Sequence, residues 1–185
     1  MKKLILFLLL VISITAQAQI SYGSFTYFPD NKMMGLYFKP QINFSKFDDL
    51  TVIGLRCCSP VDYKSFDDES RLFIRFSDET MIKLNIIKDL DIVKDFKTDY
   101  NKITGTTKFY TTFSFYEIDE DTVDKIVNGN VNIIKIRIVY TNGEIEDFDI
   151  KEKYQPKLME GLRKSLANSE KQNEKRKANM NDDDF

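Results

Sequence analysis

The stretch Asn132–Ile150, NIIKIRIVYTNGEIEDFDI, carries the clearest information about the fold class because it has the pattern of a complete β-hairpin. Asn142 and Gly143 form a turn signal between two runs rich in β-branched residues. A two-residue turn would place an isoleucine opposite an aspartate, whereas a three-residue turn pairs Ile136 with Phe148 and puts the apolar side chains on one face. We therefore predict a three-residue turn in which Gly143 adopts the left-handed conformation and forms a bulge.

A second hairpin is predicted from the runs RLFIRF (71–76) and MIKLNII (81–87), because apolar and polar residues alternate in both. The two apolar faces coincide if Phe76 lies opposite Ile82, which requires an odd number of loop residues. Further runs of aromatic and β-branched residues also indicate strands, at 24–28, 35–40 and 50–58.

Two helices are predicted. The first lies near 119–128, where Asp119 is a suitable N-cap for the apolar positions that follow. The second lies near 155–168, and its leucines recur every four residues to form one apolar face. Together these elements predict an α+β fold, mainly antiparallel β, as a sandwich or curled half-barrel of about eight strands. The C-terminal helix is expected to pack across the open face of the sheet.

The first 18 residues have the pattern of a secretory signal peptide, with two lysines, an apolar run and small residues before an expected cleavage site after Ala18. The apolar run is short for a membrane-spanning helix, and no cysteine follows it directly to accept a lipid. We expect the signal peptide at 1–18, a single globular domain at 19–168 and a disordered polar tail at 169–185. The protein would then be exported to the periplasm or the cell exterior, without lipidation and without membrane insertion after signal cleavage.

Residues 88–108 show no clean period of helix or strand. We interpret them as a long excursion from the sheet, with one helical turn around 91–96. Long loops on compact domains are often functional, so this segment is a candidate location for binding.

The two cysteines, Cys57 and Cys58, are adjacent in the sequence. Their Cα atoms lie about 3.8 Å apart across a trans peptide, below the usual range for a disulfide. Successive side chains on a strand point to opposite faces, so one thiol is expected inside beside Leu55 and the other outside. We expect both thiols to be free and to serve packing, with a strained vicinal disulfide or an intermolecular pair as the alternatives.

The composition excludes several kinds of catalysis. The chain has no histidine, so Ser-His-acid and Cys-His nucleophiles have no base, and zinc sites lose their usual ligand. The seven glycines form no phosphate-binding loop, and nothing indicates a cofactor. Enzymes that act through two carboxylates remain possible with 29 acidic residues. A net charge of −2 argues against nucleic acid as a partner.

The best candidate for a binding surface is the run FYTTFSFYEI at 109–118. Its phenylalanines lie on one face of a strand, which we expect to be core. The other face would be a flat surface able to stack on sugars or to cover a protein. The residues of this expected binding face are Tyr110, Thr112, Ser114 and Tyr116. An ordinary solvent-exposed strand face is the alternative.

Acidic residues in the segment 67–69 offer the oxygen ligands that calcium prefers, but they lack the spacing of an EF-hand. These weak candidates are Asp67, Asp68 and Glu69. Solvated loop acids are the alternative, and we expect no metal site in this protein.

Two segments, RLFIRFSDE (71–79) and IDEDTVDKIVNGNVNIIKIRI (118–138), give the chain a resemblance to small signal-peptide-bearing exported proteins of Bacteroidetes-type bacteria. The resemblance covers mainly 72–166 and rests on the arrangement of strands, a short capped helix and a closing helix. It implies no activity and no site residue.

These observations favour a non-catalytic exported binding or interaction module whose partner is a glycan or a protein. The alternative is a carboxylate-based hydrolase acting on an envelope polysaccharide, which needs two carboxyl groups about 5 to 9.5 Å apart in a cleft. A structural subunit is a third possibility, and it requires a strand edge that is free to pair with a partner.

Overall fold

The computed structural model describes residues 20–22, 25–27, 40–47, 50–87, 92–101 and 105–182. The expected signal peptide and nearly all of the expected strand at 35–40 lie outside these residues. Within them, the chain forms two antiparallel sheets, two α-helices and a short 3₁₀ helix. This confirms the α+β class with mainly antiparallel strands.

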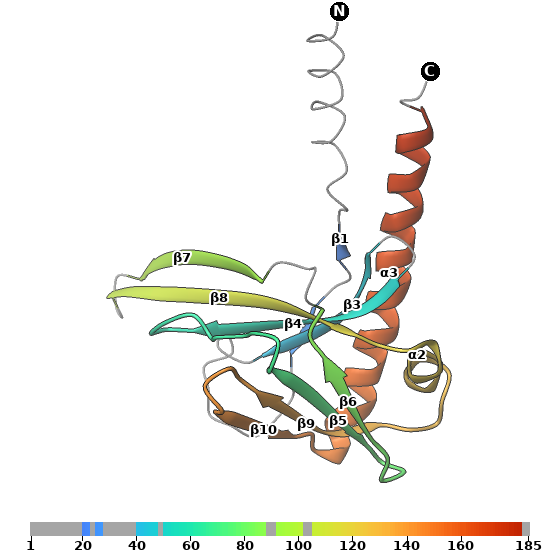
Figure 1. Ribbon diagram of the computed structural model, residues 1–185, viewed down its shortest axis with the longest axis horizontal. Coiled ribbons are helices and arrows are strands. Elements are labelled where there is room, and N and C mark those ends of the chain that lie inside the picture. The colour runs from blue at the N-terminus through green and yellow to red at the C-terminus, as the bar shows by residue number, and fades with distance from the viewer. Residues whose placement is uncertain are drawn as a thin grey trace, which may run out of the picture.

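The first sheet, which we call sheet A, has the strand order β1-β3-β4-β8-β7, with β2 also paired to β3 (Figure 1). Its strands are β1 (Ile20–Tyr22), β2 (Thr26–Tyr27), β3 (Gln41–Phe47), β4 (Leu50–Ser59), β7 (Val93–Asn101) and β8 (Gly105–Glu117). In Figure 1, β7 and β8 extend well beyond the second sheet.

The second sheet, sheet B, has the order β10-β9-β5-β6. Its strands are β5 (Arg71–Phe76), β6 (Met81–Asn85), β9 (Ile133–Val139) and β10 (Ile145–Asp149). The two sheets are linked at one corner, where Ile86 pairs with Tyr116 and the backbone N–H of Ile87 donates to the carbonyl of Phe115 at 2.9 Å. The architecture is therefore a two-layer sandwich whose sheets join at this corner.

The main hydrophobic core lies between the two sheets and is closed by both helices. Because antiparallel strands alternate their side chains, each strand gives every second residue to this core. Its fully buried members include Ile42, Phe44, Ile53, Leu55, Leu72, Ile74, Phe76, Ile136 and Ile138. Burial of each such side chain stabilises the folded state by about 1.5 to 3 kcal/mol relative to leaving it exposed to water.

The structure confirms the predicted hairpin of β9 and β10. Ile136 pairs with Phe148, and the backbone N–H of Tyr140 donates to the carbonyl of Glu144 across a three-residue loop. Gly143 has a φ of 76°, in the left-handed region that favours glycine.

In the hairpin of β5 and β6, the apolar side chains face the core as predicted, but the predicted register between the two strands is wrong. Its loop also contains three residues, 77–79, because the N–H of Phe76 donates to the carbonyl of Thr80. Ile74 therefore lies opposite Ile82, and the expected pairing of Phe76 with Ile82 is wrong by two residues. A shift of two keeps every side chain on its face, which is why alternation alone could not detect it.

Helix α2 (Glu120–Val127) begins at the predicted N-cap. One carboxylate oxygen of Asp119 accepts the backbone N–H of Thr122 at 2.7 Å, and the other accepts its hydroxyl at 2.9 Å. These hydrogen bonds lower the pKa of Asp119 despite some opposing desolvation. The helix packs Ile126 into the core between the sheets.

The 3₁₀ helix η2 (Glu152–Tyr154) leads into helix α3 (Gln155–Asp182). The predicted apolar face of α3 enters the core through Leu158, Leu162 and Leu166. The helix runs along one side of the sandwich, against β1–β3 and β9, rather than across an open sheet face (Figure 1). It also continues through 169–182, which we expected to form a polar tail. None of the helices in the described residues is long and apolar enough to span a membrane.

The segment 88–108 contains the whole of β7 and the start of β8 rather than a helical turn. β7 spans 93–101 and pairs with β8 along its length, so the expected turn around 91–96 is wrong. The side chains of β7 are solvent-exposed on both faces from Val93 to Tyr100. An exposed edge strand needs no apolar period, which explains why the sequence pattern was uninformative.

Candidate functional site

The face of β8 that we expected to be open points into the sandwich. Thr112, Ser114 and Tyr116 are 0%, 1% and 0% exposed. Pairing with β4 places Tyr116 beside Ile53 and Ser114 beside Leu55, both of which are core residues. The Tyr116 ring fills the core while its hydroxyl accepts a hydrogen bond from the Ser114 hydroxyl at 3.5 Å. The expectation of an open binding face is therefore wrong for these residues.

Tyr110, the fourth residue of the expected face, lies opposite Ser59 on β4 and Phe96 on β7. It is half-buried between two aromatic rings, Tyr63 at 5.2 Å and Phe96 at 5.0 Å between centroids. Its ring therefore has protein neighbours on two sides, and it does not form a flat surface with Thr112, Ser114 and Tyr116.

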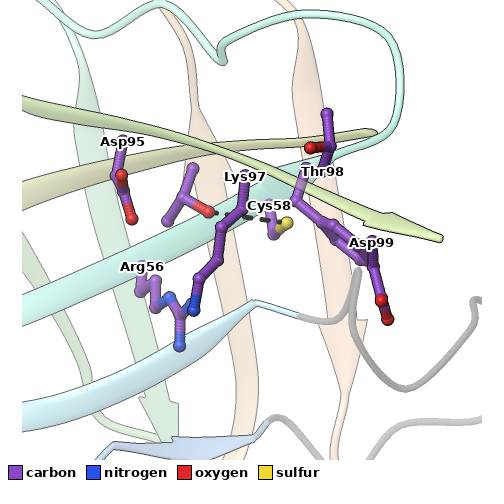
Figure 2. A pocket seen from close by; sticks show the side chains of 8 residues that line it. Arg56, Cys58, Asp95, Lys97, Thr98 and Asp99 are labelled. Atoms are coloured by element: carbon purple, nitrogen blue, oxygen red, sulfur yellow. Dashed lines mark hydrogen bonds between the residues drawn. The ribbon is translucent and has the colours of Figure 1, made fainter. Parts of the chain in front are cut away.

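A cavity of about 360 Å³ lies on the opposite, outer face of sheet A (Figure 2). Three neighbouring strands, β4, β8 and β7, supply its lining. The lining residues are Arg56, Cys58, Asp95, Lys97, Thr98, Asp99, Phe109 and Thr111. We call it the sheet A cavity.

The strand register explains why these side chains meet. Cys58 on β4 lies opposite Thr111 on β8, and Thr111 lies opposite Asp95 on β7. Lys97 similarly lies opposite Phe109. Residues directly opposite each other in an antiparallel pair share a face, so these side chains project to the same side of sheet A. Thr111 is buried in the floor, and its hydroxyl donates to the Cys58 sulfur at 3.6 Å.

Arg56 is held at the wall of the cavity by contacts along its length. Its guanidinium lies 5.5 Å from the centroid of the Phe113 ring, and Nη1 donates to Oε1 of Gln41 at 2.9 Å. Phe113 in turn packs against Phe25, with 5.8 Å between the ring centroids. The Nε atom of Arg56 is buried and has no hydrogen-bond partner among the described residues. The arginine is thus positioned by the protein while part of its donor capacity remains unused.

The four charged side chains around the cavity make no ion pairs with one another. Among the described residues, Arg56, Lys97, Asp95 and Asp99 form no salt bridge at all. In Figure 2, the side chains of Arg56 and Lys97 extend toward the same part of the cavity, with Asp95 and Asp99 to either side. The two cations together favour binding of an anionic ligand group, and the flanking carboxylates favour binding of a cationic one.

The two thiols have different environments, as the strand alternation predicted. Cys57 is buried in the core beside Leu55, with its sulfur 3.8 Å from the Tyr140 hydroxyl. Burial raises the pKa of the Cys57 thiol to about 12, although the hydrogen bond with Tyr140 opposes this effect. Since the thiolate is the reactive form, burial and the raised pKa both lower the reactivity of Cys57. Cys58 is half-buried and lines the sheet A cavity. The structure contains both as free cysteines.

The carboxylates in this cavity do not have the spacing of a glycosidase pair. Asp95 and Asp99 lie four residues apart on β7, so about 13 Å separates their backbone positions at about 3.3 Å per residue. Glycoside hydrolases place their two carboxyl groups about 5 to 9.5 Å apart. The geometry therefore gives no support to paired-carboxylate catalysis at this site.

β7 is an edge strand of sheet A, and its outer edge has no strand partner among the described residues. A structural subunit would need such an edge. β7 carries four charged side chains, at Lys94, Asp95, Lys97 and Asp99. Charges of this kind protect natural edge strands from pairing with another chain.

The acidic segment 67–69 is a turn in the structure. A carboxylate oxygen of Asp67 accepts the backbone N–H groups of Glu69 at 2.9 Å and Ser70 at 3.1 Å. Asp68 and Glu69 are exposed. In the described part of the chain, no three acidic or thiol side chains are grouped so that they could hold a metal ion.

Sequence reasoning missed most of the sheet A cavity because it treated β7 as irregular and the phenylalanine face of β8 as core. One signal was present in the sequence. From Asp95 to Asp99 every second residue is charged, and Gly105 follows shortly after, which is typical of a solvated strand that leads into a hairpin.

Comparisons with protein-family models, with curated proteins and with solved structures found no match for this chain. The expected resemblance to exported bacterial proteins thus stays a prediction. The case for a function depends on the geometry of the sheet A cavity and of the exposed faces.

Proposed function

We propose that the protein is a non-catalytic exported binding module and that the sheet A cavity is its ligand site. The ligand is a small molecule that carries both an acidic and a basic group, such as an amino acid or a short peptide. One observation carries this proposal: two cations and two carboxylates surround one cavity, yet none forms an ion pair within the described part of the chain.

The position of each charge supports this assignment. Arg56 and Lys97 come from β4 and β7, on opposite sides of β8, and they would bind the acidic group of the ligand between them. Asp95 and Asp99 each lie two residues from Lys97 on the same strand, about 6.6 Å along the backbone. They would accept hydrogen bonds from a basic group on either side.

The floor of the cavity supports binding rather than chemistry. Phe109 and the buried Thr111 provide a surface that is partly apolar and held in place by the central strands of sheet A. Ligand sites commonly combine such a surface with a few polar groups that fix orientation. The chain also has no histidine that could act as a general base.

The proposal is tested by measuring melting temperature and calorimetric binding with amino acids and short peptides. The controls are simple carboxylic acids and simple amines, each of which carries one of the two charges. We expect binding by the compounds that carry both charges and little binding by either control series. The variant Lys97→Gln should weaken binding by about tenfold, because it removes one charge-assisted contact.

Lys108→Gln is the matched control, since Lys108 is an exposed lysine on the same hairpin but on the opposite face of β8. This variant should bind as the wild type does. Equal affinities for Lys97→Gln and Lys108→Gln would reject the cavity as the site. A complete absence of binding across both series would reject the proposed ligand class.

A further inference from the structure

The outer face of sheet B carries an unusual concentration of positive charge. It faces away from the core, because the inner-facing residues of the same strands are buried in the sandwich. Its cations come from β5, β6 and β9: Arg71, Arg75, Lys83, Lys135 and Arg137. We call this surface the basic face. The chain as a whole has a net charge of −2, so the sign of this face is opposite to that of the protein.

The acidic residues of this face lie on β10, at its edge. Arg137 donates to both carboxylate oxygens of Asp147, at 2.6 and 2.8 Å, and Lys135 lies 3.3 Å from Asp147 and 3.5 Å from Asp149. Five cations therefore face two carboxylates. The pairing is confined to β9 and β10.

The cations on β5 and β6 remain available. Arg75 and Lys83 are exposed and form no ion pair within the described part of the chain. Arg71 donates to the backbone carbonyls of Asp68 and Ser70, and it forms no ion pair within the described part of the chain. The uncompensated charge thus lies on two adjacent strands.

The basic face is hollowed at its centre. A depression of about 240 Å³ is lined by Phe73, Arg75, Met81, Lys135 and Arg137. Phe73 is half-buried and lies opposite Lys83 on β6 and Arg137 on β9, so its ring has cations on both sides. Met81 is 63% exposed and extends the apolar part of the depression.

We propose that the basic face docks an acidic polysaccharide. Strands lie about 4.8 Å apart, and alternate residues on a strand lie about 6.6 Å apart, so the cations form a two-dimensional array. Such an array matches a polymer that repeats its negative charge, whereas a single small anion would contact only one or two of these side chains. Phe73 and Met81 supply apolar surface for the carbon face of a sugar ring.

A polysaccharide fits this face better than nucleic acid does. Nucleic-acid binding rests largely on phosphate contacts and is usually accompanied by a strongly basic domain. Here the cluster of five cations occupies one face of a chain whose net charge is −2. If the protein is exported as expected, extracellular or envelope polysaccharides are also the polyanions that it meets.

The experiment measures binding of the full chain to polygalacturonate, in which each sugar carries a carboxylate. Fully methyl-esterified polygalacturonate is the matched uncharged polymer. We expect binding to the acidic form alone, and we expect affinity to fall as salt is raised from about 50 to about 200 mM. The double variant Arg75→Gln/Lys83→Gln should weaken binding by about tenfold or more.

The control is the double variant Lys94→Gln/Lys108→Gln, which removes two exposed lysines from sheet A and makes the same change in net charge. It should bind as the wild type does. Both pairs of substitutions are at exposed positions, and matching melting temperatures verify that each variant folds. The substitution Lys97→Gln in the sheet A cavity should leave polysaccharide binding unchanged, which separates this inference from the proposed function.

Four results would overturn the inference. The first is that the wild type binds neither polymer, and the second is that it binds both equally, in which case charge does not direct the contact. The third is an equal loss of affinity in the two double variants, which would assign binding to net charge rather than to this face. Binding of duplex DNA as tight as that of polygalacturonate would reject a polysaccharide as the specific partner.

Discussion

Glu79 and Gly143 occupy the same position in two different hairpin turns. Each is the third residue of a three-residue loop, with φ of 67° and 76°. In each loop the preceding residue, Asp78 or Asn142, accepts a hydrogen bond through its side chain from the backbone N–H two residues further on. The turns therefore share their geometry, but only one has the residue type that this geometry favours. A non-glycine residue in the left-handed region costs about 1 to 2 kcal/mol.

Glu79→Gly should stabilise the protein by about 0.5 to 1 kcal/mol, since relief of the left-handed strain outweighs the greater entropy of glycine in the unfolded chain. Gly143→Val should destabilise the protein by about 1 to 3 kcal/mol, because a β-branched residue is strained at the positive φ of this position. Urea unfolding measures both changes. Glu79→Ala is the matched control, because it removes the same side chain without relieving the backbone. Equal stability of the glycine and alanine variants would contradict the strain at Glu79.

Helix α3 is positioned by two small residues one turn apart. The hydroxyl of Ser165 accepts the backbone N–H of Phe44 at 2.8 Å, at a point on β3 between the segments that pair with β1 and β2. Gly161 lies against the side chain of Thr26 on β2, where a Cβ atom would overlap it. The helix therefore completes the edge of sheet A, in addition to covering the core.

Gly161→Ala should destabilise the protein by about 1 to 3 kcal/mol, because the added methyl group collides with Thr26. In a free helix the same change stabilises by about 1 kcal/mol, so the sign of the effect identifies the contact. Thermal and urea unfolding provide the measurement. Combining Gly161→Ala with Thr26→Ala should recover part of the loss, as expected for residues in contact. A stabilising effect of Gly161→Ala alone would show that α3 does not approach β2 this closely.

Two carboxylates link different parts of the fold around sheet B. Asp78, in the turn between β5 and β6, lies 2.8 Å from Lys125 on α2, and the hydrogen bond from Lys125 is the main reason that the pKa of Asp78 falls to about 2. Hydrogen bonds from Arg137 likewise lower the pKa of Asp147 on β10 to about 2. Both carboxyl groups have an ordinary pKa of 3.8. They therefore favour the folded state whenever they are ionised.

The free energy of unfolding should fall as the pH decreases from about 4 to about 2. A carboxyl group whose folded pKa is depressed contributes its stabilisation above its unfolded pKa and loses it as pH falls through the folded value. The double variant Asp78→Asn/Asp147→Asn should be less stable at neutral pH and should show a shallower decline. Urea unfolding at several values between about pH 5 and pH 2 tests this. Parallel curves for wild type and variant would contradict the role of these two groups.

Much of the fold was predictable because its signals are local. The turn at Gly143, the N-cap at Asp119 and the leucine face of α3 each depend on residues within a few positions of one another. The register of β5 with β6 was predicted less well, since it depends on where a three-residue loop begins. β7 was not predicted, because an edge strand that is solvated on both faces has no apolar alternation.

The candidate cavity was hardly predictable. The sequence predicted only one feature of the cavity lining, namely that one of the two adjacent thiols points outward, and in the structure this thiol is Cys58. Arg56 and Lys97 lie 41 positions apart and meet only because β4 and β7 both pair with β8. Neither residue has a local signature that distinguishes it from an ordinary surface cation.

The amino-acid pattern alone determined the α+β class, the turn at Gly143 and the helix start at Asp119, because these follow from side-chain alternation and from hydrogen bonds between near neighbours. Which face of β8 is buried depended instead on packing between distant segments. Both faces of that strand carry aromatic residues, so alternation could not distinguish them. Sheet B packs over the face of Tyr116 and leaves Phe109, on the other face, to line the cavity. The physical reason is that burial is decided by what packs against a face, which the sequence of one strand does not contain.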